Sequence, residues 1–308
     1  MRKYFLFAAI ILFSKISYCQ NHNVYVLKWK LQPNESIIYK TQMEKIDSSD
    51  YKMFKLNINS IINSMPDSIK QKIEIKGELD SSKINEFYNS FSSMNKNYNL
   101  YSIISANKDK SVDVKMILKK SIDASKKENS LDSLVQMMTQ NNGGVVLRGE
   151  INEDGSIGSF YLRQRQKNLL AMLFELPAKP VRIGDVWSLE INLLEFDQNF
   201  ICTESNKKNT VELMGVKEVN NEEIAYLKYD VNEMVRGDFY NPLSGKAIPT
   251  YMEMSFNGVN EFSITKGRWK KFDCVTKTDA SGFSEAHQIE TDVMVPIDNI
   301  SLDNLINK

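Results

Sequence analysis

Residues 252–278 read MEMSFNGVNEFSITKGRWKKFDCVTKT, and this stretch carries the clearest structural pattern in the chain. From residue 252 to residue 264, apolar and polar residues largely alternate, which is the two-residue period of a half-buried strand. Lys266-Gly267 is a turn signal, and a second strand is expected over residues 269–278. We therefore predict an antiparallel hairpin whose first strand bends near Gly258.

The same alternation continues on both sides of this hairpin. Asn220-Asn221 is a second turn signal between two alternating runs, and a final run precedes the C-terminal tail. The runs upstream and downstream cover residues 187–193, 211–219, 225–235 and 286–295. These segments predict a large curved antiparallel sheet, either an open sheet or a half barrel.

The N-terminal half mixes further strands with helices. Residues 24–31 and 36–46 alternate on either side of Pro33-Asn34 and are expected to form an opening hairpin. A strand is expected over residues 112–118, and Asp154-Gly155 predicts a hairpin between residues 145–151 and 156–162. Residues 51–77 fit neither the strand period nor the helix period.

Three segments have the spacing of an amphipathic helix. Ile84, Phe87, Tyr88 and Phe91 follow the i, i+3, i+4, i+7 pattern, as do Leu131, Leu134, Val135 and Met138. A third helix is expected over residues 164–176, where Pro177 would end it. We predict an α+β fold in which about three helices, inserted in the N-terminal half, cover one face of the sheet.

Residues 1–19 resemble a secretory signal peptide. Arg2 and Lys3 precede an apolar run that is too short to span a bilayer, and Ser17 and Cys19 are small enough for cleavage before Gln20. We expect an exported, periplasmic or secreted protein. The alternative is membrane anchoring through a lipid on Cys19, although the bulky residue that precedes this cysteine fits the lipoprotein pattern poorly.

The remaining chain is expected to form one domain over residues 20–296, followed by a loose tail over residues 297–308. The alternative is two lobes that meet near residues 125–145.

Removing residues 1–19 takes away three of the 39 bases and none of the 39 acids, which leaves 36 bases against 39 acids. The bases are scattered rather than gathered in a stripe, which argues against nucleic-acid binding. No later apolar run is long enough for a transmembrane segment.

Catalytic signatures are weak in this sequence. The chain has two histidines, His22 and His287, and no nucleophile elbow, so a hydrolytic triad would depend on His287 alone. Cys202, Cys274 and His287 lack the spacing of metal ligands, and the glycine pairs lack the lysine or helix start of a phosphate loop. We predict no enzyme activity, no metal and no cofactor. Cys202 and Cys274 could pair after export, but we expect no essential disulfide.

Residues 176–187, LPAKPVRIGDVW, resemble the LPxxPVxxGDxW motif of exported Bacteroidota-type proteins of unknown function. The resemblance covers about residues 143–296 and implies a structural motif rather than a catalytic one. The long strands with Met-rich and Phe-rich helices resemble, more weakly, the lipoprotein-carrier-like half barrels. That resemblance implies a concave sheet that shelters an acyl chain.

These patterns lead to a functional hypothesis with one alternative. The hypothesis is that the concave face binds an apolar ligand such as a lipid. The alternative is a structural or protein-binding role in the envelope, in which the same apolar residues are solid core. The residues expected to line the ligand site are Phe87, Phe91, Leu134, Met138, Leu227, Met254 and Phe256.

Overall fold

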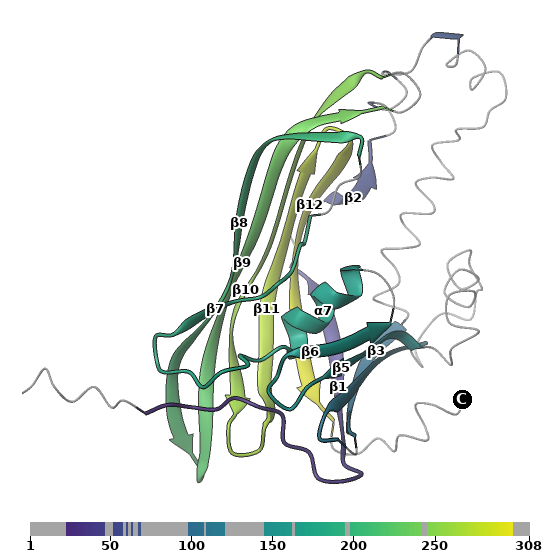
Figure 1. The fold of residues 1–308 in the computed structure, drawn as a ribbon. Coiled ribbons are helices and arrows are strands. Elements are labelled where there is room, and N and C mark those ends of the chain that lie inside the picture. The colour runs from purple at the N-terminus through teal and green to yellow at the C-terminus, as the bar shows by residue number, and fades with distance from the viewer. Residues whose placement is uncertain are drawn as a thin grey trace, which may run out of the picture.

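The computed structural model describes residues 23–46, 52–57, 60, 63, 67–68, 98–107, 109–120, 145–161, 164–194, 198–241 and 245–297. Within these residues, twelve strands form one antiparallel sheet, and a single helix of seven or more residues, α7 (Gln164–Phe174), packs against it (Figure 1). The long strands form a tall curved wall, and shorter strands turn across its lower part with α7 between them.

The strands are β1 (Ser36–Lys45), β2 (Lys52–Leu56), β3 (Tyr98–Ala106), β4 (Val112–Lys120), β5 (Val145–Ile151), β6 (Ile157–Tyr161), β7 (Val186–Ser188), β8 (Phe200–Val219), β9 (Glu222–Tyr240), β10 (Ala247–Ser263), β11 (Arg268–Ser281) and β12 (Ser284–Pro296). Their order in the sheet is β6-β5-β4-β3-β1-β12-β11-β10-β9-β8-β7, and β2 also pairs with β12. The strand β1 therefore lies beside the last strand, and this pairing joins the two halves of the chain.

The turns between the long strands follow from residues that tolerate positive φ. Asn220 and Asn221 have φ values of 53° and 61°, as a two-residue hairpin turn between β8 and β9 requires. Gly267 has a φ of 61° between β10 and β11, and its carbonyl accepts a hydrogen bond from the Lys30 amide at 3.1 Å. Both predicted turns are confirmed.

Close approach of strands explains the glycine in β10. A Cβ atom at Gly258 would lie 2.4 Å from the Asp273 carbonyl oxygen and 2.7 Å from the Cys274 sulfur, so a larger residue cannot fit without a shift of β11. The β10–β11 register also shifts between Glu261 and Phe262, a bulge that locally increases strand twist.

The main core packs between the concave face of the sheet and α7. Leu170, Ala171 and Phe174 of α7 are fully buried, and Leu170 lies so close to β5 that a Cβ atom at Gly149 would overlap it. Two buried indoles bind the end of the helix: Trp29 donates to the Phe174 carbonyl at 3.0 Å, and Trp269 donates to the Leu173 carbonyl at 2.8 Å. These bonds satisfy carbonyls that a helix end leaves without intrahelical partners.

The predicted α+β class with about three helices is wrong. The helix expected over residues 164–176 is present as α7, but the helix faces built on Ile84 and on Leu131 lie outside the described residues. The described chain is mostly strand because β8 and β9 run for 20 and 19 residues, several times the usual strand length. The segment that forms β3 was also not recognised as a strand.

The predicted opening hairpin is wrong as well. Residues 24–31 form no ladder with β1; only Tyr25 makes an isolated bridge, to Val181. Leu27 and Trp29 alternate because an extended segment places every second side chain in the core. For the same reason, a strand was predicted over residues 187–193, although only β7 (Val186–Ser188) forms there. The predicted hairpin β5–β6, the strand β4 and the meander from β8 to β12 are confirmed.

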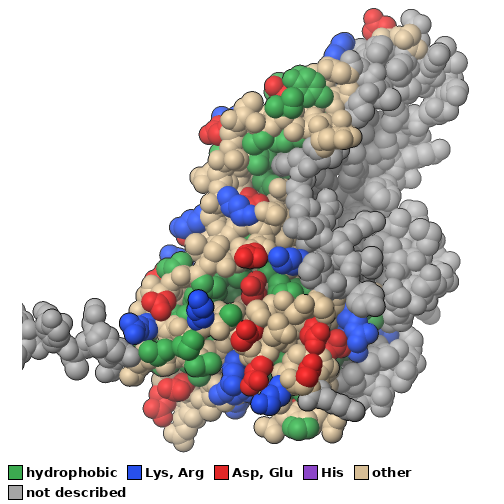
Figure 2. Space-filling model, in the orientation of Figure 1, with side chains coloured by type: hydrophobic (Ala, Val, Ile, Leu, Met, Phe, Trp, Pro, Cys, Tyr) green, Lys and Arg blue, Asp and Glu red, His purple; other side chains and the backbone are tan. Residues whose placement is uncertain are grey.

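Charged side chains on the visible face are mixed in sign. Figure 2 shows acidic and basic side chains interspersed over the described residues of this face, with apolar side chains in small groups between them. Surface ion pairs such as Arg236–Glu204 at 3.2 Å and Lys208–Asp230 join neighbouring strands β8 and β9. Exposed pairs of this kind contribute little to stability.

Candidate functional site

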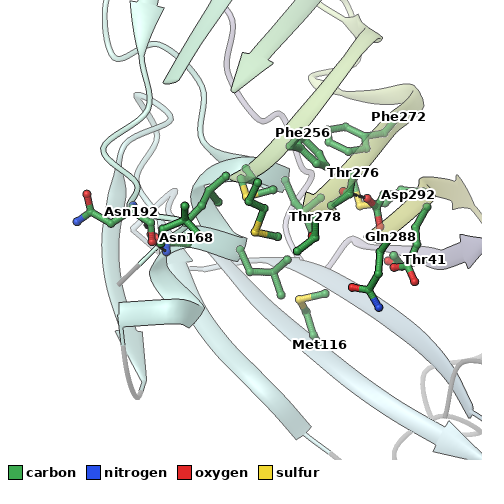
Figure 3. Close-up of a pocket in the computed structure, with 18 of the residues that line it drawn as sticks. Thr41, Met116, Asn168, Asn192, Phe256, Phe272, Thr276, Thr278, Gln288 and Asp292 are labelled. Atoms are coloured by element: carbon green, nitrogen blue, oxygen red, sulfur yellow. Dashed lines mark hydrogen bonds between the residues drawn. The ribbon is translucent and has the colours of Figure 1, made fainter. Parts of the chain in front are cut away.

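A pocket of about 500 Å³ lies between the concave face of the sheet and α7 (Figure 3). Strands β10, β11 and β12 supply its floor, with Thr41 from β1 and Met116 from β4. Helix α7 and the extended residues 192–194 supply the opposite wall.

Strand register explains why these floor residues share one face. In β10, β11 and β12, Met254 pairs with Thr278, which pairs with Gln288; in the next row, Phe256 pairs with Thr276, which pairs with Glu290. Paired residues in an antiparallel sheet point to the same side, and every second residue along a strand does so too. The pocket floor is thus a grid of inward-facing residues.

Most of the lining is apolar and flexible. Among the described residues, those that form the apolar lining are Met116, Leu169, Met172, Leu173, Leu193, Leu194, Met252, Met254, Phe256, Phe272 and Met294. Five of these are methionines, whose unbranched thioether side chains adapt to ligands of irregular shape. A lining of this kind suits an alkyl or aromatic group rather than a sugar or a nucleotide.

One end of the pocket is polar. Asp292 is 9% exposed and accepts a hydrogen bond from the Thr276 hydroxyl. Burial raises the pKa of the Asp292 carboxyl to about 6, the hydrogen bond from Thr276 lowers it, and the neighbouring carboxylate of Glu290 raises it further. Thr41 is 7% exposed, and its hydroxyl is buried without a hydrogen-bond partner. Figure 3 shows Thr41, Asp292, Thr276 and Gln288 gathered at this end.

At the opposite end of the pocket, the side chains of Asn168 and Glu233 hold the chain in place through hydrogen bonds. Asn168 of α7 donates to the Asn192 carbonyl and accepts a hydrogen bond from the Asn192 amide at 3.1 Å. The buried carboxylate of Glu233 accepts from the Leu194 amide at 3.1 Å and pairs with Lys207 at 3.3 Å. These bonds fix residues 192–194 over the pocket.

The predicted ligand-lining residues divide into three groups. Met254 and Phe256 line the pocket. Leu227 lies on the concave side of β9 but is fully buried in the core and does not line it. Phe87, Phe91, Leu134 and Met138 lie outside the described residues.

Sequence reasoning missed the polar end and the contribution of α7. Asp292 and Glu290 belong to the inward-facing register of β12, whereas Val293 and Val295 occupy the other register. A signal was present in the sequence, because polar residues at every second position beside inward-facing apolar strands mark a site that is not ordinary core.

His287 lies next to Asp279 on the face of the sheet opposite the pocket. His287 Nδ1 lies 2.5 Å from an Asp279 carboxylate oxygen, and the two side chains are 38% and 41% exposed. They alternate with the pocket residues Gln288 and Thr278, and so face away from the pocket. Within the described chain, no cluster of His, Cys, Asp and Glu has the geometry to hold a metal ion.

Cys202 and Cys274, the two cysteines in the described part of the chain, are not joined by a disulfide. Cys202 is exposed on β8, and Cys274 is buried on β11, where Asn260 donates to its sulfur at 3.2 Å. Burial raises the pKa of the Cys274 thiol to about 12, so this group stays protonated and unreactive.

The LPAKPVRIGDVW segment forms a turn and pairs with the extended chain near the N-terminus. The Asp185 carboxylate accepts from the Arg182 amide at 2.8 Å, and Gly184 adopts a φ of 90°, which together form a tight turn. Val181 exchanges backbone hydrogen bonds with Tyr25, so the segment also holds the N-terminal extended chain. Trp187 is only partly buried, and its indole N–H has no partner.

Among the residues that the structure describes, no helix is long and apolar enough to cross a membrane. Comparison of the chain with protein-family models and with curated proteins finds no match.

Proposed function

We propose that this is an exported envelope protein that binds an apolar ligand such as a lipid in the pocket between α7 and the concave face. The observation that carries the proposal is the pocket itself: about 500 Å³, lined mainly by apolar side chains. Sites for small ligands usually measure roughly 300–1,000 Å³ and combine an apolar lining with a few polar groups.

The size of the pocket favours a binding site over ordinary core. Protein interiors are close-packed and rarely leave voids larger than a water molecule. The surrounding core is packed in this way: Trp269 lies 5.1 Å from Phe262 and 5.2 Å from Phe272 between ring centroids. The chain thus fills its lower concave face with aromatic rings and leaves space beside Met254.

Met254→Trp should abolish ligand binding with little loss of stability. The indole would occupy space that is now empty, so the substitution competes with a ligand rather than with neighbouring side chains. We would titrate the purified protein with N-phenyl-1-naphthylamine, a neutral probe whose fluorescence rises in apolar sites. The wild type should bind the probe, and the variant should bind it at least about tenfold more weakly, a change of about 1.4 kcal/mol.

Val259→Trp is the matched control, because Val259 lies on the same strand β10 but is 45% exposed. This variant should bind the probe like the wild type. Absence of probe binding by the wild type would contradict the proposal. So would a loss of roughly 1–3 kcal/mol in the unfolding free energy of Met254→Trp, which is the cost expected of an overpacked solid core.

The export part of the proposal has a separate test. Expression of the full chain in a host with a signal peptidase should yield a mature protein that begins at Gln20, because Ser17 and Cys19 suit the enzyme that cleaves there. Intact mass and N-terminal sequencing measure this directly. A diacylglycerol-sized increment on a chain that starts at Cys19 would instead show the lipid-anchored form.

A further inference from the structure

We propose that the pocket selects amphiphiles whose polar end is a hydrogen-bond donor or a cation, and that it disfavours those ending in a carboxylate or phosphate. The proposal rests on the proposed function, since it names the ligand class of the same site. It depends on the polar groups that meet at one end of the pocket: Thr41, Thr276, Gln288, Glu290 and Asp292.

Strand pairing brings these groups together. Thr41 of β1 pairs with Met294 of β12, and Asp292 lies two residues before Met294, on the same face. On the other side of β12, Thr276 pairs with Glu290 and donates to Asp292. The polar groups therefore form one patch on β1, β12 and β11, beside the apolar floor of β10.

The buried threonine points to a ligand rather than to an internal network. The Thr41 hydroxyl lines the pocket and has no hydrogen-bond partner, although buried polar groups in folded proteins are nearly always hydrogen-bonded. A polar group on a bound ligand would satisfy it. Because a hydroxyl can both donate and accept, Thr41 does not decide the charge of that group.

The acidic residues of the pocket determine which charge on the ligand is favoured. Asp292 and Glu290 line the pocket, and no Lys, Arg or His occurs among its described lining residues. Lys207 reaches only the far rim, through Asn192, and is paired with Glu233. An anionic head at the polar end would face the buried carboxylate of Asp292 in a site of low dielectric, whereas an ammonium or a hydroxyl donor would be attracted to it.

The test compares ligands that share one alkyl chain. Dodecylamine, dodecanol and dodecanoate, each below its micelle concentration, would displace N-phenyl-1-naphthylamine near pH 8, where Asp292, with a pKa of about 6, is ionised. Dodecylamine should bind at least about tenfold more tightly than dodecanoate, with dodecanol between them. Equal or tighter binding of dodecanoate would overturn the inference.

Two variants locate the selectivity. Asp292→Asn and, as a second variant in case the first does not fold, Glu290→Gln should each reduce the ratio of amine to carboxylate affinity several-fold while probe binding is retained. Asp279→Asn, on the opposite face of β11, is the control and should keep the ratio. A ratio unchanged in both pocket variants would overturn the role of the acids. Failure of all three ligands and of the probe to bind the wild type would instead reject the proposed function.

Discussion

Trp269→Ala should lower the free energy of unfolding by about 3–5 kcal/mol, which is the range for removing a large buried aromatic side chain. Trp269 is 1% exposed and lies at the centre of the aromatic core, with Phe262, Phe272 and Tyr229 around it. It also donates to α7. The variant would lose ring contacts and leave the Leu173 carbonyl buried without its donor. Equilibrium urea unfolding measures the difference.

Trp269→Phe separates the two contributions. Phenylalanine retains most of the apolar volume but cannot donate to Leu173, so we expect a loss of roughly 1–3 kcal/mol, the cost of leaving a buried carbonyl without its partner. Trp187→Ala is the control, because this indole is partly exposed and its N–H has no partner. A cost of Trp269→Ala no larger than that of Trp187→Ala would show that the aromatic cluster is not the centre of the core.

Local signals predicted the C-terminal meander well. The turn residues Asn220-Asn221 and Gly267 and the alternating runs beside them are features of one segment and its neighbour, so they are visible in the sequence. Pairing between β1 and β12 depends on residues about 250 positions apart, such as Thr41 and Met294, and no local pattern encodes it. This is why the N-terminal hairpin was predicted in its place.

Alternation reports burial of an extended chain and not its hydrogen-bond partner. Leu27 and Trp29 alternate into the core without belonging to a strand, and Leu189 and Ile191 do the same beyond β7. A similar limit applies to the pocket. Met254 and Phe256 were predicted to line it because they are apolar, whereas Asp292 was not predicted, because the register of β12 determines that it points inward.

Glu175→Gln should make the protein more stable at high pH and leave it unchanged at low pH. Glu175 follows the end of α7, and one of its carboxylate oxygens is buried without a hydrogen-bond partner. Burial raises the pKa of this carboxyl to about 7; Lys167 lowers it in part, and Glu190 adds to the rise. The folded protein therefore favours the protonated acid.

The pH window follows from that direction. The contribution of Glu175 to stability is fully present below its ordinary pKa of 4.5 and is lost as the pH rises through about 7, because the unfolded chain releases this proton first. A glutamine has no charge to bury, so the variant should equal the wild type near pH 4 and exceed it by roughly 2 kcal/mol near pH 8, after allowance for solvent screening.

Urea unfolding of both proteins across this pH range measures the difference directly. Asp292, whose pKa is also raised, is present in both proteins, so its contribution cancels when the variant is compared with the wild type at each pH. Glu218→Gln, which neutralises an exposed carboxylate on β8, controls for the loss of one charge. A stability difference between Glu175→Gln and the wild type that does not change with pH would mean that Glu175 is ionised in the folded protein, and that the space behind α7 is accessible to water.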